Sequence, residues 1–290
     1  MKTDASAFSK MAGLALLACL VSANGAHAQT GSGSPPPTYD YDSEIAGTQP
    51  PKSPLLTNYE YRSVRTYQVS IPVLVPLNQL QAILPAGYTA IASPGDSQTA
   101  SLSLGFFMDQ RFERTGVAQS FGPVSALLVS TTVLNTNVEP ARQELVFPSF
   151  SASGEIDALN ASFGPGSARL ADVKVKVEEK KGKLYFTFDV NDAALGFKIH
   201  AEAESPAALN NRSLSDPVGL AFRTFNGTTP NNAFRAASQS DTLSVPAADA
   251  KVKLQTRGHK LRFPAGSLSI VGLGANVGFS RNVEFILKFE

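Results

Sequence analysis

Most of this chain consists of short apolar runs of the kind that form β-strands. From about Asn58 onward, β-branched and aromatic residues alternate with polar ones or stand in continuous runs, broken by Gly, Pro, Asn and Asp. Such runs bounded by turn residues are typical of strands, and 233 residues is an ordinary length for one all-β domain. The pattern predicts strands over 64–75, 99–108, 124–134, 169–178, 184–190, 197–203, 249–255 and 283–289.

One segment has a helical pattern instead. In PLNQLQAILPAGY, which starts at Pro76, the residues Leu77, Leu80 and Ile83 recur at helical spacing. Proline suits the first turn of a helix, and Pro85 cannot continue one. We therefore expect a short amphipathic helix between two strands.

Residues 1–28 have the pattern of a secretory signal peptide. Lys2 and Lys10 precede an apolar run, and Ala26-His27-Ala28 is a small-x-small cleavage site. A membrane-spanning helix needs about 20 apolar residues, roughly twice this run. The sequence thus predicts an exported protein, periplasmic or secreted, that begins at Gln29. A competing interpretation is a lipoprotein processed and anchored at Cys19.

Residues 29–57 are rich in Gly, Ser and Pro and poor in aliphatic residues, which predicts a flexible linker. The domain expected after it spans 58–290. Cleavage after Ala28 would remove the single cysteine, so no disulfide could stabilise this domain and a hydrophobic core must do so.

The charge of the expected mature chain is balanced. Loss of Lys2, Lys10 and Asp4 lowers the 25 basic and 24 acidic residues to 23 of each. A balanced count gives no net attraction toward nucleic acid or an anionic membrane, so neither partner is predicted.

Two lysines stand out in the stretch DVKVKVEEKKGKLYFTF. Lys174 and Lys176 alternate with valines, and Gly182 stands where a hairpin would turn. Alternation puts the valines on one face and the lysines on the other, so we expect both lysines on a solvated face. A Schiff-base lysine needs the opposite setting, because desolvation lowers its pKa.

The order of these features resembles the acetoacetate decarboxylase family. VRTYQVSIPVLVPLNQLQAILPAGY resembles that family's arginine-bearing strand and its helix ending in Leu-Pro, and GSARLADVKVKVEEKKGKLYFTF resembles the segment around its lysines. The resemblance implies a mainly β fold, a single closed or partly closed antiparallel β-barrel with a few short helices. It also makes a homo-oligomer plausible.

In that family, a lysine forms a Schiff base with a ketone. A neighbouring lysine helps to keep this amine neutral, which is an established example of activation by a nearby cation. Alignment through Leu170 puts Ala168 at the position of the reactive lysine and Arg169 at that of its neighbour, with Ser167 before them. Neither alanine nor a permanently charged arginine can act as this nucleophile. The resemblance therefore implies a member that lacks the Schiff-base lysine pair.

Arg65 matches the position of the family's substrate-facing arginine. The resemblance implies a cavity near Arg65 and the 167–169 turn, with Arg65 and Arg169 as substrate-binding residues and no catalytic residue assigned. We expect binding of a small, partly apolar carboxylate or carbonyl compound, without Schiff-base decarboxylation. Two alternatives stay open: a diverged carbon–carbon lyase that stabilises an enolate-like charge with its arginines, and a structural or interaction protein with a filled barrel.

The sequence has no strong motif for metal binding, phosphate binding or serine-based hydrolysis. Only His200 and His259 follow the expected signal, with no spacing typical of zinc ligands, so no metal is predicted. FGPGS lacks the Gly-Lys-Ser/Thr of a phosphate-binding loop, and no Gly-x-Ser-x-Gly elbow precedes a helical pattern. No cofactor is predicted.

Overall fold

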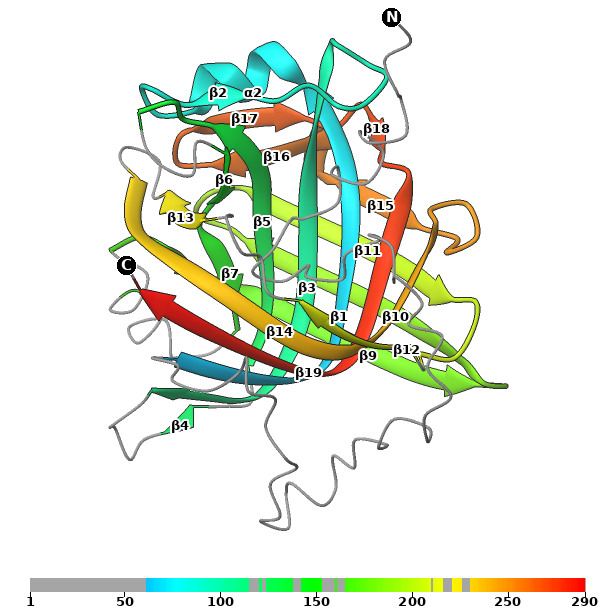
Figure 1. The fold of residues 1–290 in the computed structure, drawn as a ribbon. Helices are drawn as coiled ribbons and strands as arrows, with labels where there is room; N and C mark the ends of the chain where they lie inside the picture. The colour runs from blue at the N-terminus through cyan, green and yellow to red at the C-terminus, as the bar shows by residue number, and fades with distance from the viewer. Residues whose placement is uncertain are drawn as a thin grey trace, which may run out of the picture.

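The structure, a computed structural model, is mainly β (Figure 1). It describes residues 61–114, 120–121, 124–137, 142–152, 160, 165–209, 211–215, 221–225 and 230–289. The expected signal peptide, Cys19 and the expected linker lie outside the described residues. Within these ranges, no helix has the length and apolar character needed to cross a membrane.

The largest sheet has 13 strands, and most pair with neighbours that are distant in sequence. Along its main path the order is β4-β3-β1-β19-β14-β13-β6-β5-β7-β8, and β5 also pairs with β3. Its strands are β1 (Tyr61–Pro76), β2 (Thr89–Ala90), β3 (Thr99–Arg114), β4 (Ser120–Phe121), β5 (Val124–Leu134), β6 (Arg142–Val146), β7 (Ser149–Ser151), β8 (Ala168–Leu170), β12 (Asn211–Ser215), β13 (Ala221–Phe225), β14 (Pro230–Pro246), β18 (Gly272–Leu273) and β19 (Asn276–Phe289).

A second sheet has four antiparallel strands in the order β15-β11-β10-β9, and a third is the hairpin β16–β17. Their bounds are β9 (Asp172–Lys180), β10 (Lys183–Asp192), β11 (Phe197–Ser205), β15 (Lys253–Thr256), β16 (Lys260–Phe263) and β17 (Gly266–Ser269). A short 3-10 helix, η2 (Arg257–His259), joins β15 to β16.

The hairpin between β9 and β10 turns where the sequence predicts. Lys181 and Gly182 have φ angles of 54° and 70°. Two-residue hairpin loops favour turns in which both central residues have positive φ, which glycine adopts without strain. The predicted hairpin is confirmed, and it fixes the register of β9 on β10.

The predicted helix is also confirmed. It is α2 (Leu77–Ile83), which follows Pro76 and ends at Leu84, before Pro85. Leu80 is its buried residue, and the helix lies over one end of the large sheet beside β17 (Figure 1).

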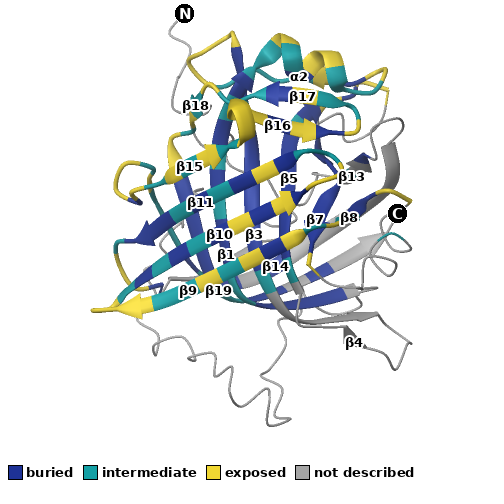
Figure 2. Cartoon of the chain, turned by 180° about the vertical axis from the view of Figure 1, so that it is seen from behind, coloured by how far each residue is buried: buried dark blue, intermediate teal, exposed yellow. Residues whose placement is uncertain are grey.

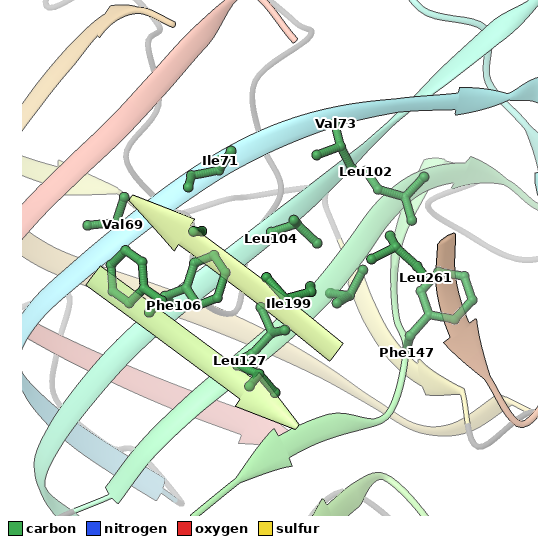
Figure 3. Close-up of a cluster of buried hydrophobic side chains, with 14 of the residues drawn as sticks. Val69, Ile71, Val73, Leu102, Leu104, Phe106, Leu127, Phe147, Ile199 and Leu261 are labelled. Carbon is green, nitrogen blue, oxygen red and sulfur yellow. The ribbon is translucent and has the colours of Figure 1, made fainter. Parts of the chain in front are cut away.

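The hydrophobic core lies between the large sheet and the four-stranded sheet. In Figure 3, Val69 and Ile71 of β1, Phe106 of β3 and Leu127 of β5 lie close to Ile199 of β11. Across this interface the ring of Phe106 stacks on that of Phe188 in β10, with centroids 4.3 Å apart. Figure 2 shows the same division by burial along the four-stranded sheet, where buried and more exposed positions alternate along β10 and β11.

The mainly β class is confirmed, but the expectation of a single antiparallel barrel is not. The described strands form three sheets, and the pairs β6–β13 and β7–β8 are parallel. The hydrophobic pattern reports that a segment is a strand with a buried face, but not which strand it pairs with. The apolar faces of β9, β10 and β11 are buried by packing across the core, so these strands need no place in the large sheet.

We predict that replacing Phe188 by Ala lowers the free energy of unfolding by about 3–5 kcal/mol, because it removes a buried ring from the stack on Phe106. Thr187, on the other face of β10, is only partly buried and serves as the matched control. Urea unfolding followed by circular dichroism measures both variants. Equal losses for Phe188→Ala and Thr187→Ala would contradict this assignment of the core.

Candidate functional site

Arg65 lies in a local irregularity of β1. The pairing of β1 with β3 has register shifts on both sides of it, at Val64/Arg65 and at Arg65/Tyr67. Side chains alternate between faces along a regular strand, which would send Arg65 and Gln68 to opposite faces. Such irregularities re-aim side chains, and here Arg65 Nη1 donates a hydrogen bond of 2.8 Å to Gln68 Oε1. The bulge therefore brings Arg65 to the face that holds Gln68.

The guanidinium of Arg65 is buried, with 3% of the residue exposed. Besides its bond to Gln68, its Nε donates a longer bond of 3.4 Å to Ser63 Oγ. Its Cζ lies 4.1 Å from the centroid of the Phe107 ring. A cation over an aromatic face is stabilised by the negative face of the ring, more so when water is excluded. Arg65 is thus a buried cation between amide, hydroxyl and aromatic groups.

The face that carries Arg65 is polar and turned away from the phenylalanine core. Gln68 and Phe107 alternate with Val69 and Phe106, which point into that core. The same large sheet holds buried hydroxyl groups, including Ser103, which shares a hydrogen bond of 2.8 Å with Ser70.

A buried carboxylate lies on β6 of the same sheet. Glu144 is fully buried, and its Oε2 accepts a hydrogen bond of 2.9 Å from Thr132 Oγ1. Thr132 and Glu144 are directly paired residues of β5 and β6. Sequence reasoning did not identify Glu144, because a single acidic residue in RQELV has no local signal of burial.

A buried ion pair lies three residues before Arg65. Arg62 Nε and Glu284 Oε1 are 2.7 Å apart, and the side chains are 1% and 3% exposed. These residues are 222 positions apart and meet because β1 and β19 pair in register. No sequence signal links two such distant residues, so this pair was also not predicted.

Arg169 does not lie with Arg65. It is 31% exposed, and its Nε donates a hydrogen bond of 2.7 Å to Asp192 Oδ2. Asp192 ends β10, and Arg169 pairs with Phe150, whose ring stacks on Phe197 in the core. Arg169 therefore points toward the four-stranded sheet, whereas Arg65 is on the opposite face of the large sheet. The two predicted binding arginines are not brought together.

The residue before Arg169 is hydrogen-bonded to Asn160. Ser167 and Ala168 are buried. The Ala168 amide donates a 2.8 Å hydrogen bond to Asn160 Oδ1, and Asn160 Nδ2 donates a 3.3 Å bond to the Ala168 carbonyl. The position that the resemblance equates with the reactive lysine thus holds a buried methyl group.

Lys174 and Lys176 lie on a solvated face, as the alternation predicts. Their side chains are 72% and 68% exposed, and they pair with Asp172 and Glu178. Hydrogen bonds from Lys176 and then from Lys180 lower the pKa of the exposed Glu178 carboxyl to about 2. These lysines are in water, which is the wrong setting for a Schiff-base amine.

His200 lies beside two carboxylates on the four-stranded sheet. Within the described residues no group of three His, Cys, Asp or Glu side chains has the arrangement of metal ligands. His200 Nδ1 lies 2.8 Å from Asp189 Oδ1, and its Nε2 lies 3.4 Å from Glu202 Oε1. The hydrogen bond with Asp189 raises the pKa of His200, against a smaller opposite effect of burial.

Comparison with known proteins gives only distant structural likenesses. No family model matches the chain, and no curated protein matches its sequence. An acetoacetate decarboxylase structure from Legionella pneumophila subsp. pneumophila str. Philadelphia 1 is similar with a TM-score of 0.49 and 13% identity, over 86% of this chain and 92% of that one. A second acetoacetate decarboxylase structure has a TM-score of 0.46 and 10% identity, over 82% and 92%. No statement about this chain rests on such low scores, so membership of that family stays a prediction.

Glu284→Gln should lower the free energy of unfolding by about 3–5 kcal/mol, because it removes the charged carboxylate that pairs with the buried guanidinium of Arg62. The double variant Arg62→Met/Glu284→Leu replaces both charges with apolar groups and should cost less than Glu284→Gln alone. Urea unfolding of the three proteins measures this. A Glu284→Gln variant as stable as the wild type would show that the pair has little effect.

The stability contribution of His200 should depend on pH. Its pKa is raised in the folded state, so the protonated form stabilises the fold. This contribution is fully present below the ordinary value of 6.5 and is lost as pH rises through the raised folded pKa. The difference in unfolding free energy between wild type and His200→Gln, measured between about pH 5 and 8, should therefore shrink as pH rises. A constant difference would contradict the assignment.

Proposed function

We propose that this protein binds a small, partly apolar carboxylate or carbonyl compound at Arg65. The observation that carries this proposal is the burial of the guanidinium on the polar face of the large sheet, over the ring of Phe107. We also propose that the chain is exported after removal of residues 1–28, with 29–57 as a linker to a domain over 58–290.

The contacts of Arg65 favour a ligand with two different parts. An arginine remains charged in proteins and donates planar, paired hydrogen bonds that fit a carboxylate. Shielding from water strengthens an ionic hydrogen bond, since the effective dielectric constant is lower than in bulk. The adjacent Phe107 ring offers apolar contact to an alkyl or aryl group. An anionic head with a short apolar body matches both.

The lysines argue for binding without imine chemistry. Every lysine whose side chain is described lies at the surface. Among those that form ion pairs, Lys183 is the least exposed; its side chain is 40% exposed and pairs with Glu204. A hydrogen bond from Lys183 to Glu204 raises the lysine pKa, which favours the charged form. A Schiff-base amine must be neutral, so the pKa of Lys183 is shifted in the wrong direction for this chemistry.

The rival lyase would need Arg65 and Arg169 to act on one substrate. Their side chains point to opposite faces of the large sheet, and Arg169 binds Asp192. Stabilisation of an enolate-like charge by both arginines is therefore disfavoured. The other rival, a structural or interaction protein, predicts no ligand effect at Arg65 at all.

Calorimetric titration of the purified full chain with hexanoate and benzoate tests the proposal, with hexanamide as the uncharged match. We expect both acids to bind more tightly than the amide, and Arg65→Gln to weaken acid binding by about tenfold or more, since a hydrogen bond to a charged group contributes about 1.5–3 kcal/mol. Arg169→Gln is the matched control and should bind as the wild type does.

If Arg65→Gln fails to fold, Phe107→Leu serves in its place and should weaken benzoate more than hexanoate. Two results would overturn the proposal: no acid binds the wild type, or Arg169→Gln weakens binding as much as Arg65→Gln. Borohydride treatment with acetoacetate tests the second part, because labelling of any lysine would mean that Schiff-base chemistry remains.

A further inference from the structure

One corner of the outer surface gathers basic side chains that form no ion pair with the described carboxylates. Lys198 of β11, Arg257 of η2 and Lys260 and Arg262 of β16 are all exposed. We call these four residues the basic corner. Within the part of the chain that the structure describes, no ion pair joins any of them to a carboxylate.

The four residues are neighbours in space because of the sheet registers. Ile199 pairs with Thr256 at the end of β15, and Lys198 and Arg257 are the chain neighbours of this last pair, with Arg257 in η2. Arg262 lies over the turn before Lys198. If Gly196 in this turn had a Cβ atom, that atom would be 3.4 Å from Arg262 Nη1. Like charges gathered in one small area repel each other. The corner is therefore destabilising unless an anion is nearby.

Three other lysines near the four-stranded sheet differ from these four residues, because each is paired with a carboxylate. Lys183 and Lys251 both bind Glu204, and Lys253 binds Glu202. The corner thus gathers four exposed cations to which the described residues supply no ion pair. The balanced total charge does not reveal it, since a total averages over the whole surface.

Exposed aliphatic side chains lie beside the corner. Val271 is 57% exposed and Leu273 37%, two of the four large apolar residues exposed in the described ranges. The Ile270 amide donates a 2.9 Å hydrogen bond to the His259 carbonyl, which continues the β16–β17 pairing of Lys260 with Ser269. Leu268 and Ile270 turn inward, so alternation sends Ser269 and Val271 outward, on the side of Lys260. Figure 2 shows β15, β16, β17 and β18 grouped at the same end of the molecule.

We propose that the basic corner and Val271 with Leu273 dock the protein on an anionic lipid surface. Basic side chains attract anionic headgroups, and neighbouring aliphatic side chains enter the interface. A soluble polyanion would use the cations but gain nothing from exposed valine and leucine, which is why we favour a membrane. This docking is independent of ligand binding at Arg65.

Sedimentation of the full chain with lipid vesicles tests the proposal. Vesicles of phosphatidylcholine with about one third phosphatidylglycerol should bind more protein than pure phosphatidylcholine, and salt of about 0.5 M should remove the difference by screening. Residues 1–28 carry Lys2 and Lys10 and can add to binding on anionic vesicles, but they are the same in every variant. Each variant is therefore compared with the wild type on the same vesicles.

Lys260→Gln/Arg262→Gln should weaken binding to the anionic vesicles about 25-fold, since each basic side chain near such a surface contributes roughly fivefold. Lys174→Gln/Lys176→Gln makes the same charge change on β9 and should have little effect. Val271→Ser should also weaken binding, while leaving retention on soluble polyphosphate unchanged.

Three results would overturn the proposal: equal binding to both vesicle types, equal loss in the β9 control, or unchanged vesicle binding by Val271→Ser. The last outcome would identify a site for soluble polyanions instead. Circular dichroism of each variant shows whether it is folded, and any unfolded variant is replaced by Arg257→Gln/Lys260→Gln, for which the same results are expected.

Discussion

The packing of phenylalanine rings between the large sheet and the four-stranded sheet determines much else in this molecule. Phe106 and Phe188 stack at 4.3 Å, and Phe150 and Phe197 at 4.0 Å. This contact uses one face of the strands β1, β3 and β5. Buried polar groups such as Gln68 and Ser103 then belong to the other face, where burial is favourable only if they have hydrogen-bond partners. The polar site thus follows from the arrangement of the apolar core.

Much of the local structure could be predicted from the sequence. The strand at Val124–Leu134, the helix after Pro76 and the turn at Gly182 are where the patterns predict them. Each depends on residues close together in the chain. By contrast, β14 (Pro230–Pro246) was not predicted, because PNNAFRAASQSDTLSVP alternates small and polar residues and lacks a hydrophobic signal.

The site could be predicted only in part. The position of Arg65 came from resemblance, but its orientation depends on register shifts that arise from pairing with β3. The Arg62–Glu284 pair depends on β1 meeting β19, and the separation of Arg169 from Arg65 depends on sheet assignment. These features belong to the pairing of distant strands, which periodicity does not encode. For the same reason the basic corner is invisible in a charge count.

The place of β1 in the large sheet affects how the chain can fold. β1 is the first strand described, and one of its edges pairs with β19, the last. The chain therefore cannot complete this sheet until β19 has left the ribosome. Contacts between such distant segments make folding slow, because a long loop must close before they form. The order of strands in the sheet thus delays the native state until β19 has been synthesised and lengthens the period in which the chain is still unfolded.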